Sequence, residues 1–260
     1  MSGFPRAFDP SAIRAVAFDA YGTLFQNETP PDYWYARELL ERQSLQADHG
    51  ALERSIREAW RSASPSGLAR LAGTSTEPVT NLELQLNGPL PEWRSAWEIW
   101  RRQYEIAFAE HGIAGDADDA ANYLRDVLAR LTAYPDAHDT LNRLDTAGHL
   151  LGLLSNADDD FLHRALSRTQ LRFSVIQSSE SLRIYKPHRA AFLALCAGLG
   201  CEPQQVLYAG DSPTSDVLGA RNAGLRTAWV RREWSTYPND LPPPDLEVTS
   251  LIEVAGALGA

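Results

Sequence analysis

Short apolar runs of strand length alternate with helical patterns through most of this sequence, and that alternation constrains the fold more than any other feature. The runs lack the polar alternation of a half-exposed strand, so we expect both faces of each strand to be buried. They are Ala15 to Phe18, His149 to Leu154, Val206 to Ala209 and Thr227 to Val230. Strands of this kind are typical of parallel sheets.

Helical patterns lie beside these runs, and three of them are followed by a glycine where a helix would end. The patterns cover Ala137 to Ala147, Phe161 to Leu166, Ala190 to Leu199 and Val217 to Ala223, and the glycines are Gly148, Gly200 and Gly224. Strands that alternate with helices predict an α/β fold with a doubly wound, Rossmann-like parallel sheet.

The stretch between the first two predicted strands shows helical patterns only. In Glu92 to His111 aromatic residues recur every three or four positions, and a second helix is expected at Ala117 to Leu131. Prolines and glycines predict a loop with at most short helical pieces at Ser62 to Pro91. We therefore expect an inserted all-helical domain at residues 27–132 and an α/β core domain made of residues 1–26 and 133–260.

Composition narrows the class of partner. The 260 residues carry 24 basic and 34 acidic side chains, a formal net charge of −10, and an acidic surface repels phosphate backbones. The apolar runs are too short for a membrane span, and Asp9 and Pro10 interrupt the place of a signal peptide. Cys196 and Cys201 fit neither a disulfide framework nor a zinc site. We expect a cytoplasmic protein with a small-molecule substrate, no nucleic-acid or membrane partner, and two buried thiols.

Lys186 is the only lysine among the 24 basic residues, and the other 23 are arginine. The single lysine could be a result of chance. Alternatively, this position requires a compact ammonium group on a flexible stem, which a planar guanidinium cannot replace.

Polar residues stand at the carboxyl ends of the predicted strands, where open α/β sheets bind ligands. Asp19, Ser155 and Asp211 are placed there, and Asp216 follows about where a helix begins. Carboxylates that crowd together raise one another's pKa unless a cation lies among them. Lys186 can supply one positive charge, and oxygen ligands without nearby His or Cys suit Mg²⁺. The sequence therefore predicts a Mg²⁺ site, although Asp216 by itself could simply cap a helix.

Four ordered segments resemble the motifs of the haloacid dehalogenase superfamily of hydrolases. They are DAYGTLF at residues 19–25, LLSN ending at Asn156, YKP at residues 185–187 and GDSPTSDVLGARNAGL at residues 210–225. The resemblance covers residues 14–26 and about 133–255, and the helical insert resembles that superfamily's cap domain. It implies a hydrolase.

The resemblance assigns a nucleophile and a metal site. Asp19 corresponds to the carboxylate that attacks the substrate and forms a covalent aspartyl intermediate. Together with the Tyr21 carbonyl and Asp211 it would bind Mg²⁺, while Asp216 would hold Lys186 or a water bound to the metal.

The remaining motif residues would bind the substrate and shape the loop. Gly22 lets the chain turn away without a side chain in the pocket, and the Thr23 hydroxyl would tie the loop. Ser155 and the backbone of Asn156 would hydrogen-bond the phosphoryl oxygens, and Lys186 would neutralise the nucleophile and the substrate.

The sequence departs from the superfamily's patterns at positions that bear on the reaction. Its phosphatases carry a second Asp, as in DxDGT, that protonates the leaving oxygen, and here that position is Tyr21. With Tyr21 at that position, the first motif instead resembles that of the 2-haloacid dehalogenases, which use no metal. Those dehalogenases have Ser and Asn where this sequence has Asp211 and Pro213, and a carboxylate there would repel a substrate carboxylate unless a metal intervened. The sequence therefore favours a Mg²⁺-dependent phosphatase of a small phosphorylated metabolite.

Three alternatives follow from the same residues. The first is a metal-independent 2-haloacid dehalogenase, and the second is a binding or regulatory protein with little turnover, because Tyr21 removes the acid. The third is a phospho-accepting receiver domain, against which the helical insert and the second Asp-bearing loop argue. The oligomeric state is left open.

Overall fold

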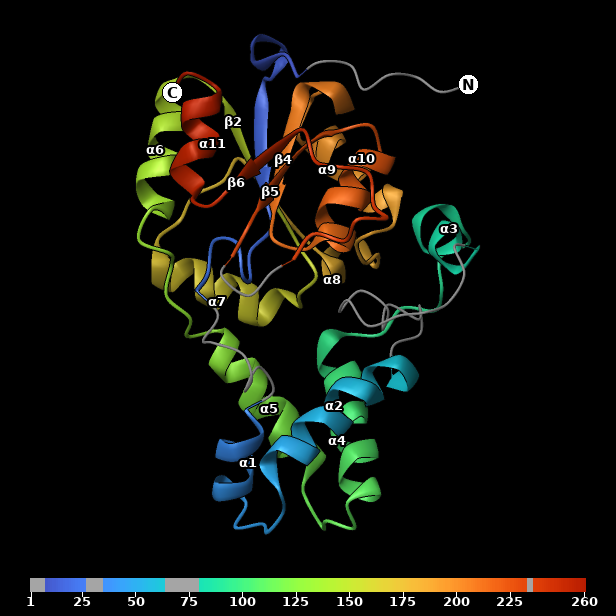
Figure 1. Cartoon of the computed structure of the whole chain (residues 1–260). Coiled ribbons are helices and arrows are strands. Elements are labelled where there is room, and N and C mark those ends of the chain that lie inside the picture. The colour runs from blue at the N-terminus through green and yellow to red at the C-terminus, as the bar shows by residue number, and fades with distance from the viewer. Residues whose placement is uncertain (1–7, 27–34, 64–79, 233–235) are drawn as a thin grey trace.

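A six-stranded parallel sheet forms the centre of the larger part of the molecule (Figure 1). In the computed structural model, residues 8–26, 35–63, 80–232 and 236–260 are described. The strand order is β3-β2-β1-β4-β5-β6, and every neighbouring pair is parallel. The strands are β1 (Ala15–Phe18), β2 (Leu150–Ser155), β3 (Val175–Ser178), β4 (Val206–Gly210), β5 (Arg226–Val230) and β6 (Leu246–Val248).

Helices cover both faces of this sheet, because β1 is apolar on both sides. The described helices of this part are α6 (Ala137–Thr146), α7 (Asp159–Thr169), α8 (Ser179–Leu182), α9 (Arg189–Leu199), α10 (Gly219–Asn222) and α11 (Leu251–Ala257). Val16 and Phe18 pack in one apolar cluster with α6 and α11, whereas Ala15 and Ala17 pack in a second cluster with α9 and α10. The doubly wound α/β fold is confirmed.

The position of the strand reversal fixes where a ligand can bind. After β1 the chain continues to β2 and β3 on one side, and then returns to β4, β5 and β6 on the other. Phe18 of β1 is in register with Leu153 of β2 and Ala209 of β4. The carboxyl ends of these three strands therefore lie side by side at the switch point of the sheet.

The two edge strands, β3 and β6, were not indicated by the sequence. Both are short and only partly buried, and polar Gln177 and Glu247 interrupt their apolar residues. A continuous apolar run indicates a strand that is buried on both faces, and an edge strand lacks such a run.

The segment from Val217 to Ala223, which the sequence predicts as one helix, belongs to two helices of different kinds. A six-residue π-helix, η4 (Pro213–Leu218), comes first, and α10 begins only at Gly219. π-Turns are wider than α-helical turns and are common at functional sites. Here the turn carries Asp216, which is 1% exposed and points toward Lys186.

Five helices lie in the described residues between 36 and 128. Four of them form the smaller part at the opposite end of the molecule, whereas the third, Thr80–Asn87, lies beside the sheet part (Figure 1). The five helices are α1 (Ala36–Arg42), α2 (His49–Ala63), α3 (Thr80–Asn87), α4 (Ala96–Glu110) and α5 (Ala117–Leu128). Within the described ranges 35–63 and 80–128 there is no strand. The boundaries at residues 26 and 133 stay a prediction. Residues 64–79 of the predicted Ser62 to Pro91 loop lie outside the described residues.

The aromatic helix begins later than predicted. Ser95 is its N-cap and Glu98 completes a capping box, so α4 starts at Ala96 and Trp93 precedes it. Trp100, Tyr104 and Phe108 are buried on one face as expected. The aromatic spacing continues before Ser95, but the capping box of Ser95 and Glu98 sets the start of the helix.

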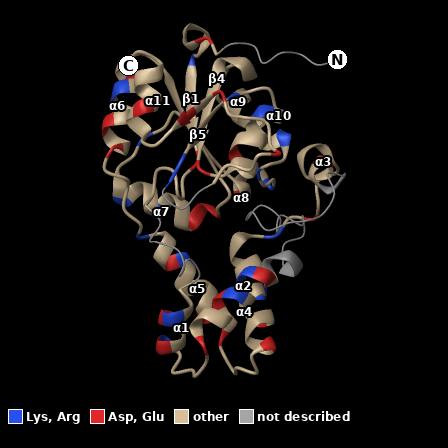
Figure 2. Cartoon of the chain, viewed as in Figure 1, with Lys and Arg blue, Asp and Glu red and all other residues tan. Residues whose placement is uncertain are grey.

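Charged residues of both signs are interspersed along the helices of both parts (Figure 2). Several oppositely charged neighbours form exposed ion pairs, such as Arg42 with Asp119 and Arg164 with Asp126. Both cysteines are free and buried, as expected. None of the described helices combines the length and the apolar character that a membrane span requires.

Candidate active site

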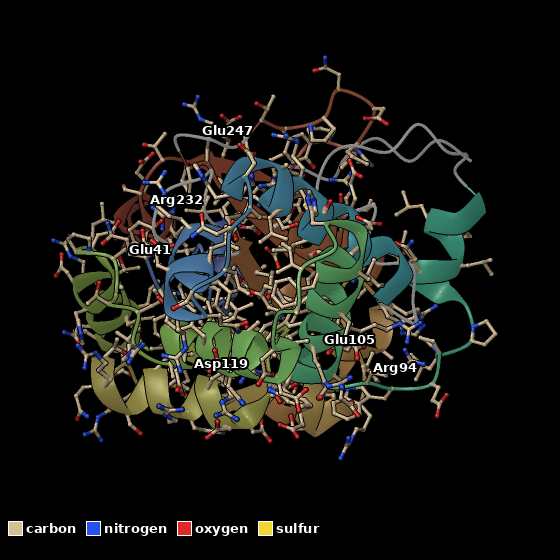
Figure 3. All side chains as sticks on the ribbon, turned by 90° about the horizontal axis from the view of Figure 1, so that it is seen from below. Glu41, Arg94, Glu105, Asp119, Arg232 and Glu247 are labelled. Carbon is tan, nitrogen blue, oxygen red and sulfur yellow. The ribbon has the colours of Figure 1, made fainter. Side chains whose placement is uncertain are left out.

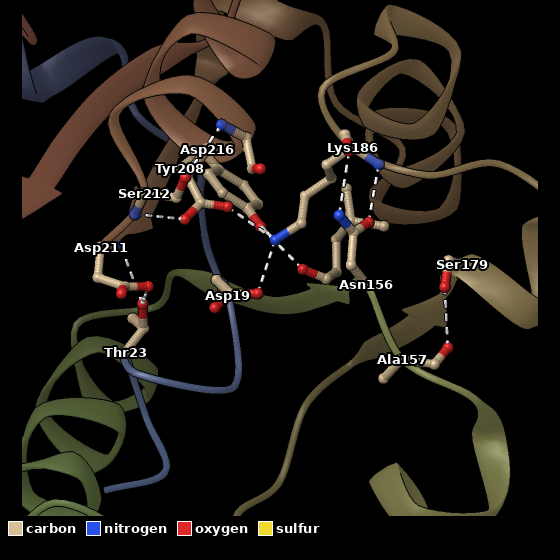
Figure 4. Close-up of polar contacts among 12 residues, drawn as sticks. Asp19, Thr23, Asn156, Ala157, Ser179, Lys186, Tyr208, Asp211, Ser212 and Asp216 are labelled. Carbon is tan, nitrogen blue, oxygen red and sulfur yellow. Dashed lines mark hydrogen bonds and ion pairs between the residues drawn. The ribbon is translucent and has the colours of Figure 1, made fainter. Parts of the chain in front are cut away.

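Lys186 is the centre of a buried polar cluster at the switch point (Figure 4). Its Nζ donates to Asp19 Oδ1 at 2.6 Å, to Asp216 Oδ1 at 2.7 Å and to the Tyr208 hydroxyl at 2.9 Å. These three partners use all three N–H groups of an ammonium ion. The side chain of Lys186 is 2% exposed. The lysine is therefore enclosed by acceptors that match a tetrahedral ammonium and not a planar fork.

Burial and the neighbouring charges shift the pKa values of Lys186 and Asp19 in opposite directions. Burial alone would lower the pKa of Lys186, but Asp19 and Asp216 outweigh it and raise that pKa well above its ordinary value. Burial raises the pKa of Asp19 to about 6, although Lys186 counteracts the effect. At pH 7 the site therefore contains a charged ammonium beside an ionised Asp19.

Asp216 has both carboxylate oxygens engaged. Oδ1 accepts from Lys186, and Oδ2 accepts from the backbone N–H of Ser212 at 2.9 Å. A Cβ atom on Gly210 would collide with the Asp216 carboxylate, so the chain needs glycine there. Of the two roles expected for Asp216, this geometry favours the support of Lys186.

Asp211 lies on the opposite side of Asp19 from Lys186 (Figure 4). Its Oδ1 accepts from the Thr23 hydroxyl at 3.1 Å, and the same hydroxyl accepts from the Asp211 backbone N–H at 3.0 Å. Burial, and then Asp19 and Asp216, raise the pKa of Asp211 to about 8. A carboxyl group with this pKa is mostly protonated at pH 7 unless a cation lies beside it. The sequence predicts that Asp211 repels a substrate carboxylate. Only the ionised form of Asp211 would do so, and the protonated form would not.

The loop after Asp19 leaves room for this carboxyl group. Gly22 has φ +86°, and a Cβ atom there would come within 2.6 Å of Asp211 Oδ2. Arg232, buried behind the loop, donates to the carbonyls of Gly22 and Thr23 at 3.0 and 2.6 Å. Gly22 is therefore required both by the backbone conformation and by the space that Asp211 occupies.

The carboxyl groups of Asp19, Asp211 and Asp216 fit a small hard cation. One oxygen from each lies within 4.8 Å of the others, and oxygen donors of this kind suit Mg²⁺. The absent side chain of Gly22 leaves the space that the Asp211 carboxyl group occupies. The expected backbone ligand, the Tyr21 carbonyl, belongs to the same loop.

Ser155 and Asn156 reach the site at the end of β2. Ser155 is 1% exposed and lines the cavity. The Asn156 side chain accepts from the Lys186 backbone N–H at 2.8 Å and donates to the Lys186 carbonyl at 3.0 Å. The Asn156 side chain thus holds the backbone of the lysine loop, a contact that the sequence did not indicate.

A cavity of about 260 Å³ joins these residues. At ~30 Å³ for each water molecule in the liquid, it holds the volume of about nine waters, which suits a small organic acid or phosphate. The sequence-predicted residues that line it are Asp19, Tyr21, Ser155, Asn156, Lys186, Asp211 and Asp216. Gly22 and Thr23 lie behind the wall, where they shape the loop and bind Asp211.

The far wall of the cavity is aromatic and apolar. The Tyr21 ring packs 5.3 Å from Phe25 and 5.7 Å from Phe161, and Trp100 packs 5.3 Å from Phe161. Trp100 and Leu128 come from the helical part, so both parts of the molecule enclose the cavity. The position where phosphatases carry a second Asp is thus part of an aromatic wall.

Six residues of the site were not predicted from the sequence. They are Tyr208, which binds Lys186, and Trp100, Leu128, Phe161, Ser212 and Ser215, which line the cavity. Tyr208 is 1% exposed, and its hydroxyl donates to the Leu154 carbonyl at 2.8 Å while it accepts from Lys186. A hydroxyl within a strand buried on both faces needs such partners, which is a signal that the sequence contained. Trp100 gave no separate signal, because its spacing fits simple packing.

Tyr208→Phe should lower the free energy of unfolding by about 1–3 kcal/mol, because Lys186 and Leu154 both lose a buried hydrogen-bond partner. Tyr237→Phe is the matched control, since its hydroxyl donates to the Pro242 carbonyl away from the site. We expect the control to cost less than about 1 kcal/mol because that hydrogen bond is exposed. Urea titration of both variants measures the difference, and equal losses would contradict the role given to Tyr208.

The chain belongs to the haloacid dehalogenase-like hydrolase family, whose model matches residues 13–224. It is similar to (S)-2-haloacid dehalogenase 4A of Burkholderia cepacia, with 25% identity over 94% of both chains. A solved dehalogenase structure with an intermediate complex superposes with a TM-score of 0.69 at 25% identity, and covers 96% of this chain and 98% of its own. The protein is therefore a hydrolase of this family.

A relative of another activity matches a smaller part of the chain. The phosphoserine phosphatase of Thermus thermophilus is 36% identical over 149 residues, which are 54% of this chain and 59% of that protein. The dehalogenase similarity thus extends over nearly the whole chain, whereas the phosphatase similarity covers about half of it.

Proposed function

We propose that this protein is a 2-haloacid dehalogenase, which corrects the preference for a phosphatase drawn from the sequence. The observation that carries the proposal is the aromatic wall at Tyr21, where a phosphatase would need an acid. A halide ion leaves without a proton, so the first step of this reaction does not need the missing group. The similarity to dehalogenases over 94% of the chain supports the same assignment.

Asp19 would act as the nucleophile. One carboxylate oxygen attacks C2 of the haloacid, and the halide leaves with the electron pair of the carbon–halogen bond. Water then attacks the carbonyl carbon of the Asp19 ester. One of its protons passes to solvent and the other to the departing oxygen that Asp19 had supplied, so the 2-hydroxyacid is released and the Asp19 carboxylate is restored. Lys186 holds Asp19 in position at 2.6 Å and stabilises its charge. Ser155 and the Asn156 backbone would bind the substrate carboxylate, since both residues line the cavity.

The proposed route differs from phosphoryl transfer in the atom that water attacks. Repeated turnover of 2-chloropropionate in H₂¹⁸O should place ¹⁸O in the carboxylate of Asp19, which mass spectrometry of the peptide detects. Hydrolysis of an aspartyl phosphate by attack at phosphorus would leave the Asp19 oxygens unlabelled. Halide release without label in Asp19 would overturn the ester mechanism.

A Mg²⁺-dependent phosphatase is the second candidate, and Asp211 favours it. Asp19, Asp211 and the Tyr21 carbonyl would hold Mg²⁺, with Asp216 behind them. The ion would supply positive charge to phosphoryl oxygens. Lys186 and Ser155 would then bind a phosphate in place of a carboxylate.

Asp211→Ser separates the two candidates. We expect Mg²⁺ affinity to fall at least about tenfold, because one carboxylate ligand is lost, while halide release from 2-chloropropionate stays within about threefold of the parent protein. Isothermal titration and halide assays measure these quantities. The exposed Asp118→Ser is the control for a general change of charge. Loss of all turnover in Asp211→Ser together with a Mg²⁺ requirement in the parent would favour the phosphatase.

A further inference from the structure

The inserted helices contact the sheet part at several places, which include the Arg164–Asp126 ion pair between α7 and α5 and the hydrogen bonds between Asn87 and Asn222. Two further places bear on the cavity. The first is the pair of covalent connections, where Gln26 donates to the Thr132 carbonyl and Tyr134 donates to the Leu24 carbonyl. Arg232 lies at this place, with its guanidinium 3.5 Å from the centre of the Tyr134 ring. The second place is non-covalent and lies at the start of α4.

Asp158, from the loop that follows Ser155 and Asn156, completes the N-terminus of α4. Its Oδ1 accepts from the Ala96 N–H at 2.8 Å, and its Oδ2 accepts from the Trp97 N–H at 3.0 Å. The helix's own capping box supplies partners only for Ser95 and Glu98. A helix begins with unpaired N–H groups and a positive partial charge. A carboxylate from the sheet part therefore satisfies two donors that α4 cannot satisfy by itself.

The lysine loop holds the same segment. The Tyr185 hydroxyl donates to the Arg94 carbonyl at 2.9 Å, and the Arg183 guanidinium stacks on the Trp93 ring at 3.9 Å. Seen from below, Arg94 and Arg232 lie on opposite sides of the molecule (Figure 3). The second attachment is thus distant from the covalent connections, and it is made by the two loops that carry Asn156 and Lys186.

Trp100 stands one helical turn after Ala96, on the same side of α4. It is 6% exposed and lines the cavity that contains Asp19. A shift of the α4 N-terminus away from the sheet part would carry Trp100 with it and enlarge the cavity. Asp158 is 7% exposed, so its two hydrogen bonds are shielded from water and strengthened by burial.

We propose that Asp158 is a positioning residue that docks α4 on the sheet part and so limits the cavity to short-chain substrates. The size limit rests on the proposed hydrolase function, but the docking does not. Asp158 contacts no reacting atom, and its effect reaches the cavity through Trp100.

Asp158→Asn tests the docking without any turnover. An amide offers one acceptor oxygen, and its NH₂ group would face a second N–H donor. Hydrogen–deuterium exchange of the Ala96 and Trp97 amides should become at least about tenfold faster in the full-length variant. Asp158→Glu, which keeps both oxygens, should restore part of the protection.

Asp116→Asn is the matched control. Asp116 also accepts from two backbone N–H groups at a helix start, those of Asp118 and Asp119, but it lies within the helical part on α5's own N-cap. Both N–H groups donate to the same oxygen, Oδ1, which an amide can replace, so exchange should change little at α5 and stay unchanged at Ala96.

The size limit is measured with two parallel series, 2-chloropropionate against 2-chlorohexanoate and acetyl phosphate against hexanoyl phosphate. In whichever series the parent turns over, Asp158→Asn should lower the preference for the short substrate in kcat/KM by about tenfold, and Asp116→Asn should not change it. Unchanged exchange at Ala96 and Trp97 would overturn the docking. Faster exchange with an unchanged preference would overturn the size limit. If the parent hydrolyses neither series, the proposed function fails, and the exchange data still decide the docking.

Discussion

Asp19→Asn should lower turnover of 2-chloropropionate by about 10⁴-fold or more, because a carboxamide is a poor nucleophile and no ester can form. The protein should remain folded. Lys186 keeps Asp216 and Tyr208 as partners at 2.7 and 2.9 Å, so the buried ammonium is not left alone.

Halide release and the mass of the intact protein after a single turnover measure this loss. The parent should gain the mass of the organic acid transiently, and Asp19→Asn should not. Asp118→Asn, an exposed residue of the helical part, is the control and should match the parent. Substantial halide release by Asp19→Asn would show that another group, such as a water molecule, attacks the substrate directly.

Lys186→Met should destabilise the fold by about 3–5 kcal/mol, because Asp19 and Asp216 would remain buried without their cation. Lys186→Arg should retain the charge but fail to restore activity, which we expect to fall about 10²-fold or more. Three acceptors lie 2.6–2.9 Å from Nζ in a space that is 2% exposed, and a guanidinium is too wide for it.

Urea unfolding and steady-state kinetics on both variants separate charge from shape. Arg42→Lys at the exposed pair with Asp119 is the reciprocal control, and it should change stability by less than about 1 kcal/mol. Nearly full activity in Lys186→Arg would mean that any cation suffices and that the single lysine of the chain is an accident of composition.

Much of this fold follows from local patterns. Runs buried on both faces predicted β1 to its exact ends, and β2, β4 and β5 to within one residue at either end. Gly148, Gly200 and Gly224 have φ of +89°, +64° and +92°, as helix stops require. Edge strands β3 and β6 were missed because their burial is mixed, so they lack the continuous apolar run.

The charged centre of the site could also be predicted, because strand ends in a parallel sheet converge. The roles of supporting residues could not. The hydroxyl of Tyr208 in a buried strand indicates that it needs partners but does not identify Lys186 and Leu154. The two hydrogen bonds of Asp158 depend on helix residues 62 and 61 positions earlier in the chain. Long-range contacts of this kind depend on how the two parts pack, which no local pattern encodes.

The cavity has a floor from the sheet part and a roof, Trp100 and Leu128, from the inserted helices. Substitutions in the roof can therefore alter which molecules enter without disturbing Asp19, Lys186 or Asp216. The converse also holds, since a change such as Asp211→Ser modifies the chemistry of the floor and leaves the roof intact. Selectivity and reactivity can thus be inherited largely separately in a chain built this way, because a different insert on the same sheet can bring a new substrate range.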